Sequence, residues 1–174
     1  MREVRGNLFT QDCDAICVTT NGIVKANGQA VMGAGVAKTA ADLYPALPFV
    51  LGRALKDKGN RLHLLTKDRF TMVRLPEPDS NLMQRKQLRY DIVALPTKQH
   101  WRNNSDINLI TVSIQDLILL TDKMGWKRVV MPPPGCGLGG LSWEDTVKPR
   151  LSSYLDDRFE VIFYEDRTAA EASP

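Results

Sequence analysis

The sequence predicts an α/β fold, a three-layer α/β/α sandwich with a central mixed sheet. Short apolar runs, several of them apolar enough for burial on both faces, alternate along the chain with amphipathic stretches of helical periodicity. Two glycine-rich segments each follow such a run directly, as loops do at the carboxyl ends of parallel strands. The length of 174 residues suits one domain with a full hydrophobic core.

Six runs are predicted as strands because they are short and apolar. They are residues 14–20, 61–67, 70–75, 90–97, 127–133 and 160–165. The second and third runs are separated only by a short polar turn, so we expect them to pair as an antiparallel hairpin. That hairpin would make the sheet mixed, with a parallel centre.

Helices are predicted between the strands. The first spans residues 35–43 and is stopped by Pro45, because proline cannot continue a helix. The second runs from Pro48, a favourable first helical residue, to Gly59.

The clearest helix, residues 105–125, repeats isoleucine and leucine at helical spacing. Ser105 is its predicted N-cap, and Gly125 its stop. A last helix is expected over residues 143–156. We expect one domain over residues 1–166 and a disordered tail over residues 167–174, whose sequence is small and polar.

Composition excludes a disordered or fibrous chain, since 43% of residues are hydrophobic and 25% charged. The net charge of +3 permits an anionic ligand without requiring nucleic acid. Three cysteines without a C-x-x-C pair, and no apolar leader at the start, predict a reduced cytoplasmic protein in which Cys13 and Cys17 are buried hydrophobes. No window is apolar enough to cross a membrane, so no membrane partner is expected. Neither a cofactor nor a bound metal is expected.

Two glycine-rich loops are the candidate binding site. They are "TTNGIVKANGQAVMGAGVAKT" (residues 19–39) and "PPPGCGLGGLSWED" (residues 132–145). Loops that leave neighbouring strands face one crevice, and Gly33 and Gly35 precede a helix whose first amides suit a phosphate. The second loop has G-x-G-x-x-G spacing, but it lies too late in the chain for a dinucleotide-binding domain. The first lacks the Lys-Ser/Thr of a Walker A loop.

Four segments together resemble the macrodomain family, and within it the branch of the DarG antitoxins and the terminal ADP-ribose glycohydrolase. They are "GNLFTQDCDAICVTTNG", "VMGAGVA", "ALPTKQHWR" and "MPPPGCGLGGLSWEDT", in that order over nearly the whole chain. The resemblance implies that ADP-ribose binds at the carboxyl ends of the strands. It also implies that Asn7 and Leu8 contact adenine and that Asn21 lies near the distal ribose.

The resemblance further implies that the two loops hold the distal ribose and diphosphate through backbone amides, where glycine permits close approach. Thr97 and Lys98 share a strand end on the same side. The predicted ligand-binding residues are Asn7, Leu8, Asn21, Met32, Gly33, Ala34, Gly35, Val36, Thr97, Gly135, Cys136, Gly137, Leu138 and Gly139.

Two departures from the branch bear on catalysis. Its glycohydrolases use a lysine that would fall at residues 40–42 here, where no lysine stands, and one enzyme has an aspartate at the position of Gly139. Lys38 lies on another face of the helix, so the lysine's role does not transfer to it. The first loop also contains an insertion at residues 23–29, whose Lys25, Asn27 or Gln29 could supply new groups.

Three further side chains have both a chemical and a structural interpretation. His100 leaves a strand end on the ligand side, where general acid–base work is possible, whereas His63 within a strand is expected to be structural. Cys136 lies between two glycines, but no histidine is near it in sequence, so backbone contact is the favoured role over a catalytic thiol.

The sequence predicts a protein that binds ADP-ribose or a derivative. Hydrolysis of ADP-ribose 1″-phosphate is the favoured reaction, with Asn21 orienting water or the distal ribose as the candidate catalytic residue. One alternative is a glycohydrolase acting on ADP-ribosylated protein or nucleic acid. The other is a binding module without activity.

Overall fold

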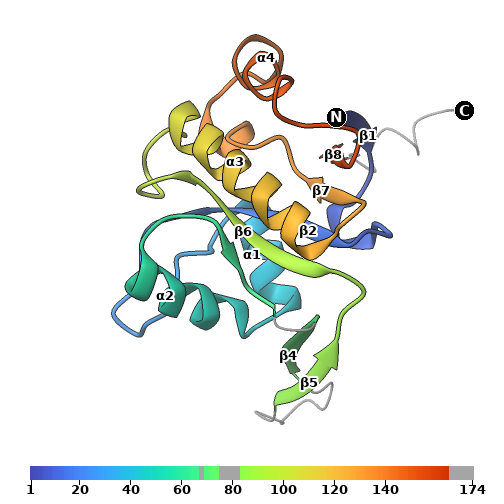
Figure 1. Ribbon diagram of the computed structural model, residues 1–174. Coiled ribbons are helices and arrows are strands. Elements are labelled where there is room, and N and C mark those ends of the chain that lie inside the picture. Colours follow the sequence, from blue (N-terminus) through green and yellow to red (C-terminus); the bar gives the residue numbers. More distant parts are fainter. Residues whose placement is uncertain (67–68, 75–82, 165–174) are drawn as a thin grey trace, which may run out of the picture.

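The computed structural model describes residues 1–66, 69–74 and 83–164, and a six-stranded sheet lies at its centre (Figure 1). The strand order is β1-β8-β7-β2-β6-β3, and every neighbouring pair is parallel except β3 with β6. The strands are β1 (Arg2–Arg5), β2 (Ala15–Asn21), β3 (His63–Leu64), β6 (Asp91–Lys98), β7 (Val129–Met131) and β8 (Phe159–Phe163). β1 was not anticipated from the sequence, and it pairs in parallel with β8.

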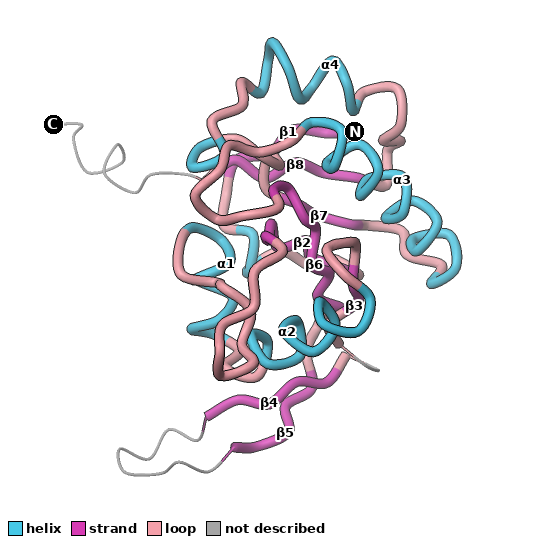
Figure 2. The backbone as a smooth tube through the Cα atoms, turned by 90° about the vertical axis from the view of Figure 1, so that its left-hand side faces the viewer, coloured by secondary structure: helices cyan, strands magenta, loops and turns pink. Residues whose placement is uncertain are grey.

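Helices cover both faces of this sheet and complete three layers, as predicted. Alternate side chains of a strand point to opposite faces, so β2 contributes Ile16 and Val18 to one hydrophobic core and Cys17 to the other. The first core lies under α1 (Gly35–Leu43) and α2 (Leu47–Lys58), and the second under α3 (Ile107–Met124) and α4 (Lys148–Leu151). Figure 2 shows the two helix pairs apart from one another, with the strands between them.

The predicted hairpin between residues 61–67 and 70–75 is wrong. β4 (Phe70–Arg74) pairs with β5 (Met83–Gln87) instead, and the two form a separate antiparallel sheet that projects from the body (Figures 1 and 2). β3 joins the main sheet beside β6, where the amide of Leu65 donates to the carbonyl of Ile92 at 2.8 Å. The sheet is therefore mixed because of β3, not because of a local hairpin.

Local signals placed the ends of α1, α2 and α3 well, except for the N-cap of α3. The bounds of α1 agree with the prediction, and Gly59 and Gly125 follow α2 and α3 with positive φ angles of 78° and 68°. The N-cap of α3 is Asp106 and not Ser105, since the Asp106 carboxylate accepts from two amides of the first turn.

The last predicted helix, residues 143–156, is shorter and mixed in type. A π-helical turn, η3 (Trp143–Val147), leads into the single α-helical turn of α4. The expected tail at residues 167–174 lies outside the described residues. Within the described part of the chain, no helix is both long and apolar enough to span a membrane.

The buried cysteines behave as small hydrophobes. Cys13 and Cys17 are buried, and neither forms a disulfide. Burial raises the pKa of the Cys13 thiol to about 12, and it raises the pKa of Cys17 as well. Both are therefore protonated thiols with little reactivity.

Candidate functional site

A cleft of about 850 Å³ opens at the edge of the sheet where the parallel strands end. The strand ends that line it are Arg5 and Gly6 of β1, Thr19, Thr20 and Asn21 of β2, Thr97 and Lys98 of β6, Pro132 and Pro133 after β7, and Ile162, Phe163 and Tyr164 of β8. Five strands thus converge on one cavity, whose volume lies within the usual range for nucleotide-sized ligands.

The loop after β2 leads to the first amide-rich wall of the cleft. Residues 33–37 line the cavity, and α1 begins among them at Gly35, whose φ of 55° favours glycine. The amides of Gly35, Val36 and Ala37 belong to the first turn of α1, so no helical carbonyl lies one turn earlier to accept their hydrogen bonds. Together with the positive end of the helix dipole, they suit an anionic oxygen in the cleft.

Asn21 holds this loop in place. Its Nδ2 donates to the carbonyl of Val31 at 2.9 Å, and its Oδ1 accepts from the amide of Ile23 at 3.1 Å. Asn21 lines the cleft although only 9% of its surface is exposed. The second N–H of Nδ2 and the second lone pair of Oδ1 remain available for hydrogen bonds to a ligand in the cavity.

The insertion at residues 23–29 does not line the cleft and packs against α2. Lys25 and Gln29 close a tight turn, and the amide of Ala30 donates to the carbonyl of Pro48 at 2.8 Å, which seats the segment on α2. Gly52 permits this seating, because a Cβ there would lie 2.0 Å from the Gly28 carbonyl oxygen. Lys25, Asn27 and Gln29 do not line the cavity, so the insertion supports the loop from outside.

The loop after β7 forms the opposite wall. Residues 135–139 all line the cleft, and Gly135 and Gly137 have φ angles of 77° and 64°, which glycine adopts without strain. The 3-10 helix η2 (Gly137–Gly139) begins here, and the amides of Gly137 and Leu138 in its first turn have no acceptor within that helix. The amide of Leu141 donates to the carbonyl of Gly135 at 3.1 Å and closes the loop.

The cleft carries positive charge and no negative charge. Among its lining residues within the described chain, Arg5 and Lys98 are the charged ones, and none is Asp, Glu or His. Lys98 Nζ donates to the carbonyl of Leu138 at 3.1 Å, so β6 is tied to the second loop. The positive charge favours an anionic ligand. The described lining residues offer neither a carboxylate nor an imidazole for proton transfer.

Ser105 occupies the space behind Gly139. Its amide donates to the Gly139 carbonyl at 2.8 Å, and its Oγ is buried without a hydrogen-bond partner in the described structure. A Cβ at residue 139 would lie 2.3 Å from that Oγ. The space beside residue 139 is therefore filled by a serine from the segment before α3, and this serine also lines the cleft.

Twelve of the fourteen predicted binding residues line the cavity, since all but Asn7 and Met32 do so. Asn7 is exposed, and its Oδ1 accepts from the amide of Phe9 at 2.9 Å, capping the short 3-10 helix η1 (Leu8–Thr10). Met32 is 5% exposed and lies in the core under α1.

Several lining residues escaped the sequence prediction. Ile162, Phe163 and Tyr164 follow from the rule that parallel strands end at one edge, applied to the last predicted strand. Arg5 could not be found that way because β1 itself was not predicted. Trp101 and Ser105 reach the cavity from a loop of irregular structure, which periodicity does not describe.

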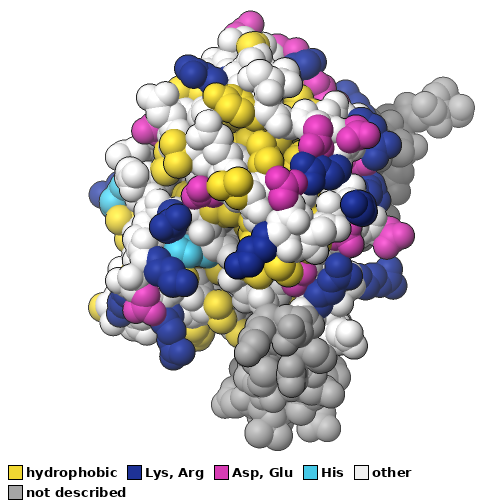
Figure 3. Space-filling view, viewed as in Figure 1, with side chains coloured by type: hydrophobic (Ala, Val, Ile, Leu, Met, Phe, Trp, Pro, Cys, Tyr) yellow, Lys and Arg dark blue, Asp and Glu magenta, His cyan; other side chains and the backbone are white. Residues whose placement is uncertain are grey.

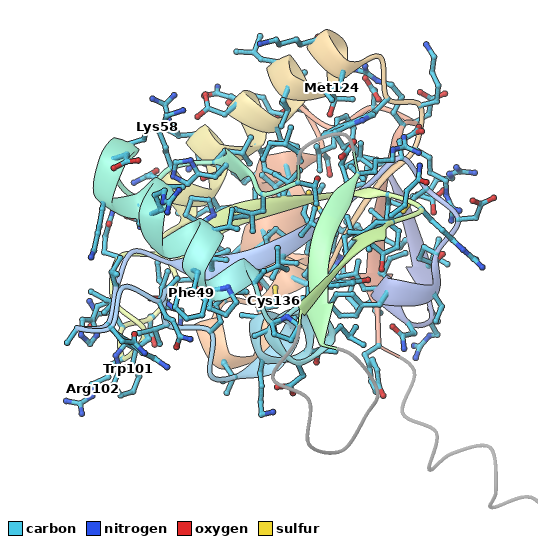
Figure 4. All side chains as sticks on the ribbon, turned by 90° about the horizontal axis from the view of Figure 1, so that it is seen from below. Phe49, Lys58, Trp101, Arg102, Met124 and Cys136 are labelled. Carbon is cyan, nitrogen blue, oxygen red and sulfur yellow. The ribbon has the colours of Figure 1, made fainter. Side chains whose placement is uncertain are left out.

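The other candidate side chains do not assemble a proton-transfer group in the cleft. Cys136 lines it, near the middle of the view in Figure 4, but burial raises the pKa of its thiol. His100 is not among the lining residues, and its Nδ1 accepts from the amide of Arg102 at 3.1 Å. Lys38 pairs with Asp42 at 2.5 Å on the exposed face of α1.

His63 is buried and structural, as expected. Its Nε2 lies 2.9 Å from the carbonyl oxygen of Gly59, so the ring joins β3 to the end of α2.

Comparison with known proteins gives a consistent set of relatives. The family model described as Macro domain matches residues 82–149. A DNA ADP-ribosyl glycohydrolase of Thermus aquaticus is 30% identical over 95% of this chain, which spans 41% of that protein. A DNA ADP-ribosyl glycohydrolase of Mycobacterium tuberculosis is 28% identical over 91% of this chain and 40% of its own length.

Solved structures agree with these relatives. The macrodomain of Mycobacterium tuberculosis DarG superposes with a TM-score of 0.65 at 30% identity, over 94% of this chain and 97% of that one. The Thermosipho africanus DarTG structure in complex with ADP-ribose superposes with a TM-score of 0.67 at 23% identity, over 94% of this chain and 42% of that one. The chain thus spans about two fifths of the length of the curated relatives it matches.

Proposed function

Because the chain belongs to the macrodomain family, we propose that its cleft binds ADP-ribose and that the protein hydrolyses an ADP-ribose derivative. The observation that carries the proposal is the pair of facing amide-rich walls, at the start of α1 and at η2, in a cleft lined by Arg5 and Lys98. A diphosphate between the two walls would accept hydrogen bonds from both.

The strand order indicates which end of the cleft would hold adenine and which would hold the distal ribose. Leu8 and the end of β8 line one part of the cleft, where apolar side chains suit the faces of adenine. Asn21 and Thr97, at the ends of β2 and β6, line the part that would receive the distal ribose. Asn7 does not line the cleft, and one lone pair of its Oδ1 is used by the Phe9 amide, so its contact with adenine would have to come from the second lone pair or from its side-chain NH2 group.

The reaction we propose is hydrolysis at the anomeric carbon of the distal ribose. Water adds to this carbon, its bond to the attached group breaks, and the departing group takes up a proton. Asn21 would orient the water or the ribose hydroxyls, while the loop amides and Lys98 hold the diphosphate in place. Positioning is the main contribution of this chain, because no carboxylate or imidazole is found among the described lining residues.

The relatives' names favour a modified nucleic acid as substrate, since several are called DNA ADP-ribosyl glycohydrolases. ADP-ribose 1″-phosphate is a second candidate. It is favoured by the absence of a lysine from residues 40–42 and by the glycine at residue 139, because phosphate release needs no nucleophile aimed at the anomeric carbon. We also propose that the protein acts in the cytoplasm, because its three cysteines are free thiols and a reducing compartment keeps thiols in that state.

Three substrates separate these possibilities. The purified protein is incubated with an ADP-ribosylated oligonucleotide, an ADP-ribosylated protein and ADP-ribose 1″-phosphate, and the products are separated by chromatography. We expect free ADP-ribose from the oligonucleotide. Release of phosphate from the third substrate alone would instead establish the second candidate. ADP-ribose binding without turnover of any substrate would contradict the hydrolase proposal and leave a binding module.

A further inference from the structure

An arginine lies at the end of the cleft that would hold adenosine. Arg5 is the last residue of β1, and it is exposed and lines the cavity. The amide of Gly6 donates to the carbonyl of Phe163 at 2.9 Å, which fixes the end of β1 beside the end of β8. Leu8 and the exposed Tyr164 line the same end of the cleft. The guanidinium of Arg5 therefore belongs to the part of the cleft whose apolar and aromatic side chains suit adenine.

Charged residues of β1 and β8 have protein partners, with Arg5 as the exception. Glu3 pairs with Lys148 at 2.8 Å, and Glu160 of β8 pairs with Arg2. Figure 3 shows basic and acidic side chains intermingled along the right-hand side of that face, where β1 and β8 lie in the same view of Figure 1. Arg5 forms no salt bridge within the part of the chain that the structure describes. Its charge is therefore available to a ligand.

ADP-ribose itself has no anionic group at its adenosine end. Its negative charges are on the two phosphates, which the proposed function places between α1 and η2, after β2 and β7. In the strand order, β1 lies two strands from β7 and three from β2, about 10 and 14 Å at the usual spacing of about 4.8 Å. The adenosine would fill this interval. An anion that meets Arg5 would thus be attached to the adenosine and not be part of the diphosphate.

We propose that Arg5 forms an anion subsite at the adenosine end of the cleft, and that this subsite selects ADP-ribose with a phosphate on its adenosine ribose. This inference rests on the proposed function, which sets the direction of the ligand in the cleft. A guanidinium binds a phosphate through paired, charge-assisted hydrogen bonds. An arginine has this role at the 2′-phosphate of dinucleotides bound to other α/β folds.

The test is calorimetric titration of the full chain with ADP-ribose and with ADP-ribose 2′-phosphate, and the measured quantity is the ratio of the two affinities. Wild type should bind the 2′-phosphate form about tenfold more tightly, as expected for one charge-assisted contact. Because Arg5 is exposed, this preference should shrink at high salt.

Two substitutions at Arg5 test its part in this preference. Arg5→Gln should lose the preference, whereas Arg5→Lys should retain some of it, because the charge stays and the paired geometry is lost. Both variants should fold, since Arg5 is exposed, and urea unfolding checks this. Lys123→Gln is the matched control, because it removes an exposed positive charge from the last turn of α3, away from the cleft. It should keep the wild-type ratio.

The outcomes separate this inference from the proposed function. Wild type that binds neither ligand would refute the proposed function itself. If ADP-ribose binds but wild type does not prefer the phosphorylated form, or if Arg5→Gln keeps the preference, the subsite is wrong. Equal losses of affinity for both ligands in Arg5→Gln would also overturn it, because Arg5 would then contact the adenosine itself. A preference that Lys123→Gln loses as well would be an effect of net charge, and it would contradict a subsite at Arg5.

Discussion

Ser105 packs against Gly139 so closely that it leaves no room for a side chain at residue 139. The Ser105 hydroxyl already lies where a side chain at residue 139 would begin, at 2.3 Å from its Cβ. The Ser105 Oγ is buried without a partner in the described structure, which is a costly position for a hydroxyl unless a ligand or water satisfies it. The two residues therefore form one structural unit and have to change together.

Gly139→Asp alone should destabilise the protein by about 1–3 kcal/mol, because the new side chain overlaps Ser105 Oγ. Ser105→Gly removes the overlapping atoms, so Gly139→Asp should cost less in that background. Urea unfolding of the two single variants and the double variant measures this coupling. Equal costs of Gly139→Asp in both backgrounds would show that Ser105 does not fill the site.

The two glycine loops that the sequence indicated, residues 33–36 and 135–139, line the cleft, and their contact with a ligand stays a prediction. Asn7 and Met32 belong to other parts of the segments that carry the resemblance and do not line it. The direction of a single side chain depends on backbone turns that a motif does not specify. Asn7 turns to cap η1, and Met32 turns into the core.

At the level of elements, local signals succeeded where long-range pairing did not. The bounds of α1 and the stop of α3 were predicted, because caps and breakers act within one turn. The partner of the run at residues 61–67 was not, since alternation of apolar residues says that a strand forms but not which strand it joins. Its partner β6 comes about thirty residues later.

A buried glutamate joins β8 to the two neighbouring strands. Glu160 has 3% of its side chain exposed, and it accepts from Arg128, which precedes β7, at 2.7 Å and pairs with Arg2 of β1. The hydrogen bond from Arg128 lowers the pKa of the Glu160 carboxyl below its usual range, although burial opposes this. Because the pKa of Glu160 is lower in the folded protein than in the unfolded chain, the ionised carboxylate stabilises the fold at any pH above the unfolded-state pKa. This stabilisation is lost as the pH falls through the folded-state pKa.

Glu160→Gln should therefore lower the free energy of unfolding by about 2 kcal/mol at neutral pH, because it removes charge-assisted hydrogen bonds. The difference from wild type should begin to shrink as pH falls below 4.5, where the unfolded-state carboxyl takes up a proton, and it should disappear below the lower folded-state pKa, where the folded carboxyl is neutral too. Urea unfolding at neutral pH and at about pH 3 tests this. A difference that stays constant with pH would contradict the assignment.

At the level of the whole molecule, the strand order creates the site. Parallel pairing brings the ends of β1, β8, β7, β2 and β6 to one edge, so segments from both ends of the chain line a single cleft. Alternation of strands and helices predicted the three layers, and the resemblance implied where the ligand binds. The sequence alone did not predict β1, and with it the Arg5 wall of the cleft, because only four residues pair there.

The central claim is that the cleft between α1 and η2 holds the diphosphate of ADP-ribose, and Gly33 tests it most directly. Gly33 lines the cleft, and a Cβ there meets nothing within 4 Å, so a side chain fits the fold but projects into the cavity. Gln115→Glu, on an exposed position of α3, makes the same change of charge away from the site.

Calorimetric titration with ADP-ribose should show that Gly33→Glu weakens binding at least about 30-fold, roughly 2 kcal/mol, because its carboxylate opposes the diphosphate. Gln115→Glu should bind ADP-ribose like the wild type. Undiminished binding by a folded Gly33→Glu variant would contradict the account, since the diphosphate would then lie elsewhere.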